Sequence, residues 1–219
     1  MVASDTGRLG IIKRAKFVSA PPIIRYRDVR PAICAYLSDD VRSVNPLISA
    51  ELKFQQQSDD PSFSSLMQDD AKKSIEVLHS IQQMNNKVSA FTFRPMQKDQ
   101  PKLSISEVEV SVVGDLFVHA VVKKIPHVGI GVLRFNQGEA DTEAAIKKRE
   151  EMGRYVATVA QRHLTQNIKP NLPISNKLCM SIDIQHGDIF CAPDANARRM
   201  ADIENACRFI KAMWPSITQ

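Results

Sequence analysis

Residues 116–135 read LFVHAVVKKIPHVGIGVLRF, and this stretch predicts two neighbouring β-strands. The first strand is expected from Leu116 to Val122, and Lys123 to His127 reads as the turn that follows it. The second strand is expected from Val128 to Phe135. Its nearly unbroken apolar character is typical of a strand that is buried on both faces. We therefore place this second strand near the middle of a sheet.

Another strand is expected just before this pair. The apolar residues between Leu103 and Val112 alternate with polar ones, as they do in a strand with one buried face. Gly114 and Asp115 then separate this strand from the next. The chain is thus expected to contribute three consecutive strands to one sheet.

The chain after residue 135 predicts a helix, a second strand pair and a last helix. The apolar residues between Leu178 and Ile184 alternate, and His186-Gly187 is typical of a two-residue hairpin turn. A short return strand and a final helix capped by Asp194 are expected to follow. The earlier helix is expected from Thr142 to Leu164, with an apolar face made of Ile146, Met152, Tyr155, Val156, Val159 and Leu164.

The residues before 101 predict mainly helices. Ala20-Pro21-Pro22 favours an extended arm before the helical spacing that begins at Tyr26. Asp60-Pro61 is typical of a helix start, with Asp60 as the N-cap. Residues 86–101 are polar and contain prolines, so they read as a connector. A further helix is expected from Pro46 to Gln57, with its inward face made of Leu47, Ile48, Leu52 and Phe54.

A strand, a long helix and another strand in this order indicate a crossover connection and a parallel strand pair. The expected fold class is α/β (α+β), a mixed β-sheet with flanking helices. Its core has the order α-β-β-β-α-β-β-α and is preceded by an N-terminal helical segment. We expect an extended basic arm over 1–25, a helical segment over 26–100 that packs on the core, and the mixed α/β core over 101–219. Together these parts are expected to form one compact domain.

The composition is that of an ordinary globular protein, with 43% hydrophobic and 24% charged residues among 219. No apolar run approaches the roughly 20 residues of a membrane span, and residues 1–17 lack the apolar segment of a secretory signal. We therefore expect a cytoplasmic protein without a membrane partner. The cysteines read as buried reduced thiols, with zinc binding or a nucleophilic thiol as alternatives: Cys34, Cys179, Cys191 and Cys207.

The chain is basic, with a formal net charge of +5 and a pI near 9.1. Nucleic acid is therefore a candidate partner, although basicity alone permits such contact without demonstrating it. Solvated helix faces explain the basic residues around 147–149 and 198–199 at least as well. The first thirty residues hold the largest basic group, made of Arg8, Lys13, Arg14, Lys16, Arg25, Arg27 and Arg30.

The order of elements over about residues 62–189 resembles the core of the PD-(D/E)XK nuclease superfamily. Members of that superfamily carry an acidic residue at the end of one strand and a D/E-x-K motif on the next. Their carboxylates hold Mg²⁺, and the Lys helps to orient the attacking water. The resemblance thus implies Mg²⁺-assisted hydrolysis of phosphodiester bonds in DNA.

Within this resemblance, Asp115 stands at the first acidic position. Val132 and Arg134 stand where the second acid and the Lys are expected, so the motif is degenerate. The side chain of Val132 has no oxygen to ligate a metal ion, and the guanidinium of Arg134 does not deprotonate. The resemblance implies Asp115, Arg134 and Glu76 as catalytic residues, and Asp115 and Glu109 as Mg²⁺ ligands.

Two literal matches to the short motif lie elsewhere, at Glu51-Leu52-Lys53 and Asp70-Ala71-Lys72. Both fall in predicted helices, whereas the superfamily carries its motif on a strand. Strand context therefore selects the imperfect site at Arg134. Because a buried Arg is costly without a partner, we expect a carboxylate beside Arg134, with Asp115 and Glu109 as the candidates.

Several functions stay open at this level. One is a nuclease-like enzyme with reduced or absent activity, and a second is a non-enzymatic binding or assembly module on the same core. A third is an unrelated α+β fold with a structural role, in which Asp115 is an ordinary turn residue after a glycine. The Trp214-Pro215 end and the strand hairpin are candidate surfaces for a homodimer, or they close the core of a monomer.

Overall fold

The predicted strand pair lies at the centre of a five-stranded sheet in the computed structural model, which describes residues 5–17, 25–135 and 142–218. Strand β4 (Leu116–Val122) pairs antiparallel with β5 (Ile125–Arg134) along its whole length. The turn between them holds Lys123 and Lys124 at φ of 50° and 67°. Two successive left-handed residues match the twist of a two-residue hairpin turn.

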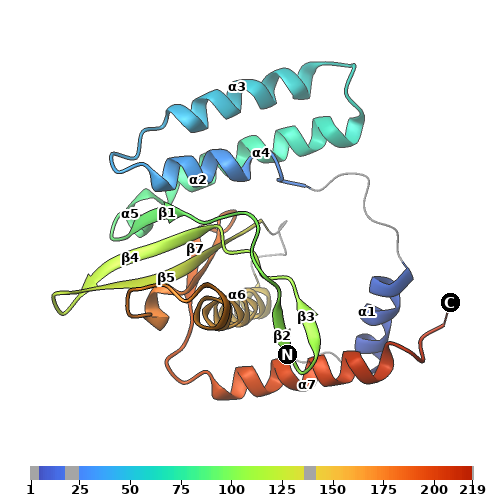
Figure 1. Cartoon of the computed structure of the whole chain (residues 1–219). Helices are drawn as coiled ribbons and strands as arrows, with labels where there is room; N and C mark the ends of the chain where they lie inside the picture. Colours follow the sequence, from blue (N-terminus) through green and yellow to red (C-terminus); the bar gives the residue numbers. More distant parts are fainter. Residues whose placement is uncertain (1–4, 18–24, 136–141, 219) are drawn as a thin grey trace.

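The expected crossover is confirmed. Strand β6 (Met180–Asp183) pairs parallel with β5, and helix α6 (Glu143–His163) connects the two strands. Strand β7 (Asp188–Cys191) returns antiparallel beside β6 and ends the sheet. The sheet order β1-β4-β5-β6-β7, with helices on both faces, confirms the α/β class and the mixed sheet (Figure 1).

Helices cover the sheet on both sides, so its central strands are buried (Figure 1). Helix α6 packs on one face, where Ile130 contacts a cluster that includes Ala157 and Ala160. The π-helical turn Leu164–Ile168 and the 3₁₀ turn Asn176–Leu178 follow it. The other face packs on α2 (Arg30–Ser38), α3 (Asn45–Asp59), α4 (Ser65–Gln83) and α5 (Asn85–Val88).

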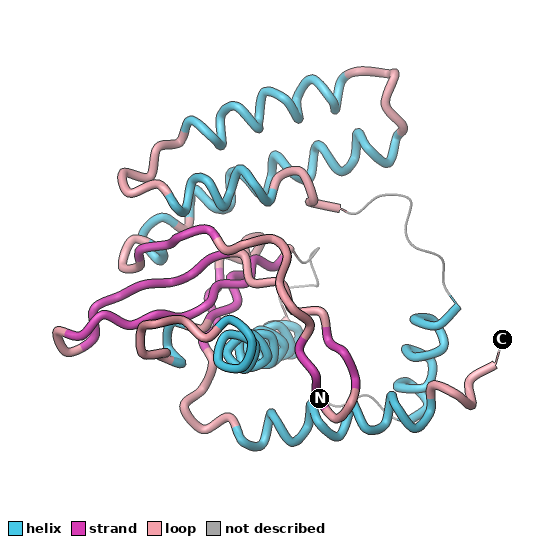
Figure 2. The backbone as a smooth tube through the Cα atoms, viewed as in Figure 1, coloured by secondary structure: helices cyan, strands magenta, loops and turns pink. Residues whose placement is uncertain are grey.

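The first strand of the sheet is not the one that the sequence predicted. Strand β1 (Thr92–Pro95) pairs with β4, although residues 86–101 were expected to be a connector. The predicted strand over Leu103–Val112 instead folds back on itself as β2 (Leu103–Ile105) and β3 (Val108–Val110). Figure 2 shows this hairpin apart from the main sheet. The boundary expected at residue 101 is therefore wrong, because β1 belongs to the sheet.

The turn and the packing of this hairpin explain why residues 103–112 do not join the main sheet. Ser106 and Glu107 adopt φ of 48° and 64°, which reverses the chain within a continuous alternating pattern. Leu103 and Ile105 then pack in a small cluster with Cys207 of α7 (Ala197–Met213). Alternation identifies a half-buried strand but does not identify the surface on which it is buried.

The N-terminal segment is helical where the sequence predicted an extended arm. Helix α1 (Asp5–Phe17) docks on α7, with Ile12 only 5% exposed. Lys16 Nζ donates to the carbonyl oxygens of Trp214 and Ile217 at 2.6 and 2.9 Å, beyond the end of α7. The prediction for residues 1–25 is thus wrong over 5–17, because contacts with α7 replace the missing apolar stripe. Ala20-Pro21-Pro22 lies outside the described residues.

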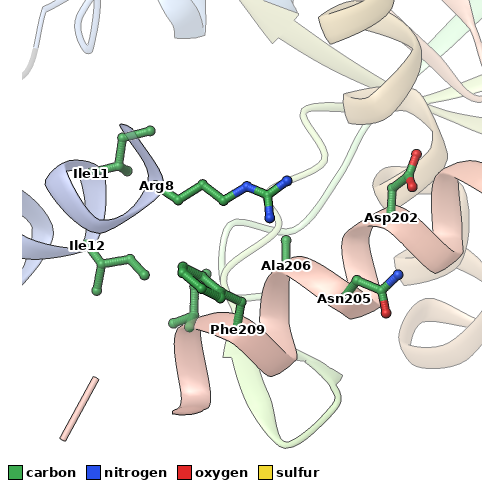
Figure 3. Close-up of a pocket in the computed structure, with 8 residues that line it drawn as sticks. Arg8, Ile11, Ile12, Asp202, Asn205, Ala206 and Phe209 are labelled. Carbon is green, nitrogen blue, oxygen red and sulfur yellow. The ribbon is translucent and has the colours of Figure 1, made fainter. Parts of the chain in front are cut away.

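A hollow of about 390 Å³ lies between α1 and α7. Figure 3 shows Arg8 reaching from α1 toward α7, with Ile11 and Ile12 beside it. The guanidinium carbon of Arg8 lies 5.9 Å from the centroid of the Phe209 ring, within the range of a cation–π contact. None of the site residues predicted from the sequence lines this hollow.

The predicted helices exist, but some starts and buried faces differ. Helix α4 begins at Ser65 with Ser64 as its N-cap, whereas Asp60 follows the end of α3. Ile48 and Leu52 of α3 were expected inward and are 46% and 57% exposed. Ile146 of α6 is likewise exposed. No helix in the described part of the chain is both long and apolar enough to cross a bilayer.

Candidate functional site

Asp115 lies directly before strand β4, where its backbone bonds to the chain just after β1 and to β5. Its backbone N–H donates to the Gly131 carbonyl at 2.9 Å, and its carbonyl accepts from the Met96 N–H at 3.2 Å. These bonds hold the residue immediately before β4 begins. Its side chain is only 4% exposed, so the carboxylate is buried rather than displayed on a turn.

Arg30, the first residue of α2, binds this carboxylate. Its Nη1 lies 2.6 Å from Asp115 Oδ1 and 2.7 Å from Oδ2. The Leu133 N–H donates to Oδ2 from the neighbouring strand at 2.7 Å. Both carboxylate oxygens are therefore already occupied by donors of this chain. Such charge-assisted bonds are about twice as strong as those between neutral groups.

An aromatic stack holds the Arg30 guanidinium in place. Its carbon lies 4.8 Å from the centroid of the Phe135 ring, and Tyr26 stacks on Phe135 with centroids 5.3 Å apart. Gln185 Nε2 donates to the Tyr26 hydroxyl oxygen at 3.0 Å. Arg30 is thus positioned by the ring below it as well as by the carboxylate in front of it.

Burial dominates the electrostatics of the Asp115 carboxylate. Desolvation raises the pKa of Asp115 above its usual range, and the charge and hydrogen bond of Arg30 and the Leu133 N–H oppose that rise.

The nearby Cys34 on α2 responds to the same charges. Its pKa rises to about 12, chiefly because the thiol is buried and also because Asp115 is negative, while Arg30 opposes the rise.

The Cys34 thiol is a reporter of this charge pair. With a pKa of about 12, about one thiol in 10⁴ is ionised at pH 8. We expect iodoacetamide to alkylate Cys34 far more slowly than an unperturbed thiol. The substitution Asp115→Asn removes a negative charge and should accelerate alkylation several-fold, as peptide mass spectrometry would measure. Equal rates in the two proteins would contradict the charge coupling.

Arg134 lies on the opposite face of the sheet from the core packed by Leu133, because neighbouring side chains on a strand alternate. Its Nη1 lies 3.9 Å from Asp183 Oδ2 and donates to Ser181 Oγ at 3.4 Å. The expected carboxylate beside Arg134 is confirmed, but it is Asp183 of β6, which the sequence did not single out. Burial lowers the pKa of Arg134, and the charge of Asp183 opposes this shift.

Asp183 is fully buried and joins the ends of β6 and β7. His186 Nδ1 lies 3.0 Å from Asp183 Oδ1, and the His186 N–H donates to the same oxygen at 3.4 Å. The register pairs Arg134 directly with Asp183 on the parallel neighbour. One sequence signal could have found this pair, since Arg134 and Asp183 are each a charged residue within an otherwise apolar strand. No comparable signal points to Arg30.

The other predicted site residues lie elsewhere. Glu76 is on an exposed part of α4, and its carbonyl oxygen accepts from Ser80 Oγ. Glu109 is on β3 and pairs with Lys102 at 3.1 Å. Among the described residues, no hydrogen bond or ion pair joins Asp115 to Arg134, Glu76 or Glu109. The expected catalytic group is therefore not assembled by direct contacts.

A Mg²⁺ ion does not fit these residues. Mg²⁺ requires oxygen ligands in near-ideal octahedral geometry, and both Asp115 oxygens are bound by Arg30 and Leu133. The side chain of Val132 offers no oxygen in the position of the second acid. Within the described ranges, no group of three His, Cys, Asp or Glu side chains is placed to hold a metal ion.

Comparison of the sequence with known protein families and with curated proteins finds no match. The site must therefore be interpreted from its own geometry. That geometry consists of two buried carboxylates, each paired with an arginine: Asp115 just before β4 and Asp183 at the end of β6, on either side of β5 in the sheet. Such pairs hold structural elements together, with Arg30 joining α2 to the sheet and Arg134 joining β5 to β6.

Proposed function

We propose that this chain is a non-catalytic assembly module on a PD-(D/E)XK-like core, and that it acts by binding a protein partner rather than by cleaving DNA. The observation that carries the proposal is the Arg30 guanidinium on both oxygens of Asp115. In a metal-dependent nuclease, a divalent cation would occupy this side of the carboxylate. Here a side chain of the protein supplies the positive charge.

The arginine is a stabilising group that performs no hydrolysis. A bound metal ion lowers the pKa of water and generates the nucleophile. A guanidinium stays protonated and has no coordination position for water. The pair at Asp115 thus retains the electrostatic neutralisation of a metal site without its chemistry.

The contacts of the N-terminal basic residues count against nucleic acid as the partner. Arg8 and Lys16 contact α7, and three arginines in residues 25–30 pair with carboxylates of this chain. Of the seven basic residues named above, only Lys13 and Arg14 make no such contact within the described part of the chain. The basic segment therefore stabilises the fold more than it offers charge to phosphates.

A cleavage assay tests the absence of catalysis. Supercoiled plasmid incubated with the protein and Mg²⁺ or Mn²⁺ is expected to stay intact, and the variant Asp115→Ala should behave identically. Fluorescence anisotropy with a labelled DNA duplex is expected to show only weak, salt-sensitive binding. Metal-dependent nicking that is lost in Asp115→Ala would overturn the proposal and favour the nuclease.

A further inference from the structure

The two edges of the main sheet differ in how they are protected. Just before β1, Arg42 Nη2 donates to the Val88 and Phe91 carbonyl oxygens, and Arg94 of β1 pairs with Asp40 at 2.8 Å. Pro95 also ends that strand. Charged groups and proline are common means of blocking an edge strand. Strand β7 has β6 on one side and, among the residues that the structure describes, no strand on the other.

The hydrogen-bond pattern identifies the backbone groups of β7 that face outward. The Ala192 N–H donates to the Cys179 carbonyl at 2.8 Å and continues the ladder between β6 and β7. Bonded pairs alternate along an antiparallel ladder, so Phe190 and Asp188 bond to β6. The N–H and C=O groups of Ile189 and Cys191 therefore point to the open edge.

This edge is held rigid by packing on both faces of β7. Ile189 and Cys191 pack against the core beneath α2 and α4. Phe190 lies so close to Gly153 of α6 that a Cβ at that glycine would come within 2.2 Å of the ring. A hollow of about 510 Å³ runs beside the strand, lined by residues 189–194 with Lys177, Glu150 and Arg154. Packing within the chain thus already fixes β7 in an extended conformation that can pair with another strand.

We propose that two copies of this chain pair through β7, antiparallel, about a two-fold axis at Phe190. In this register Ile189 of each copy faces Cys191 of the other, and every outward backbone group of these residues gains a partner. The two five-stranded sheets then form one continuous sheet. This interface specifies the partner of the assembly module and rests on that proposed function.

Charge complementarity favours a second copy of this chain as the partner that pairs with the β7 edge. The two-fold register places Gly187 opposite Pro193 of the second copy. Lys87 Nζ donates to the Gly187 carbonyl at 2.6 Å, and Asp194 is exposed next to Pro193. Lys87, which also pairs with Asp188 of its own chain at 3.5 Å, therefore lies near Asp194 of the other copy. Lys177 lines the hollow at the Asp194 end of β7, where the register brings Asp188 of the second copy, so Asp188 gains a second lysine besides Lys87 of its own chain.

Light scattering after size exclusion on the full chain tests the interface. The wild-type protein is expected to have the mass of a dimer that dissociates on dilution. Cys191→Pro removes one outward N–H per copy without breaking a bond within the chain, and should raise the dimer Kd roughly tenfold or more. Cys191→Ala retains the N–H and is the matched control. A thermal melt checks that both variants are folded.

A charge exchange tests the register independently. Lys87→Glu and Asp194→Lys are each expected to raise the dimer Kd roughly three- to tenfold. The double variant should recover the part of the loss that the contact between the copies contributes, because Lys87→Glu also removes the ion pair with Asp188 within the chain. A purely structural role for either residue would produce no recovery. A monomer at every concentration would overturn the interface and leave the β7 edge to an extended segment of another protein. A monomer would not change the expected result of the cleavage assay. Conversely, a dimer that cleaves DNA would overturn the proposed function but not the interface.

Discussion

Replacing Arg30 with methionine is expected to lower the free energy of unfolding by about 3 kcal/mol at pH 8, the low end of the range for breaking a buried ion pair. The Asp115 side chain is 4% exposed and would keep its charge without a counterion. Arg30 is itself 37% exposed, so water screens part of the interaction. Methionine retains the aliphatic stem and removes the charge.

The loss of unfolding free energy in Arg30→Met should be larger at high pH than at low pH. Burial raises the pKa of Asp115 in the folded protein, and Arg30 opposes this rise. Without Arg30 the folded pKa rises further, so the folded state binds its proton more tightly than the unfolded chain does. Stability contributed by that proton is present below the unfolded pKa and is lost as the pH rises through the folded pKa. The variant should therefore be closer to wild type at pH 4 than at pH 8.

Urea unfolding at both pH values measures this difference. The double variant Arg30→Met with Asp115→Asn removes both charges and should recover at least about half of the loss. Asp115→Asn alone is expected to have the smaller effect, because the partly exposed Arg30 remains solvated. An equal loss at both pH values would contradict a charged Asp115 as the partner of Arg30.

Replacing Gly129 with alanine is expected to cost about 3 kcal/mol, the upper end of the usual range for overpacking a core. A Cβ on Gly129 would lie 2.1 Å from the backbone carbon and oxygen of Leu178. Backbone atoms beside a central strand cannot move aside as the end of a flexible side chain can. The melting temperature should fall by about 6–12 °C for a protein of this size.

Gly131 provides the matched control on the same strand. A Cβ there would come no closer than 3.3 Å to Val118 Cγ2, and its next neighbours lie at 3.7 and 3.8 Å. Gly131→Ala is therefore expected to change the unfolding free energy by less than about 1 kcal/mol. Calorimetry on both variants compares the same substitution two residues apart. Similar losses would contradict the contact with Leu178 as the reason for glycine at position 129, because strand propensity by itself favours alanine over glycine.

The sequence drew attention to two residues of the buried ion pairs but not to their partners. Asp115 and Arg134 were singled out because they stand at the positions of the first acid and the Lys in the resemblance to the nuclease core. Both are central to buried ion pairs. Their partners Arg30 and Asp183 lie far away in sequence, and the spacing along the chain carries no information about them.

The central hairpin, the parallel step through α6 and the return strand were determined by the sequence itself. Their signals are local, since strand alternation, helical spacing and turn residues act over a few neighbouring positions. Tertiary structure decided that β1 rather than the Leu103–Val112 segment joins the sheet, and that α1 is a helix on α7. It also decided that Arg30 binds Asp115 across 85 positions of the chain. The physical reason is that burial and charge pairing depend on which surfaces meet, and a local pattern shows only that a surface must be covered.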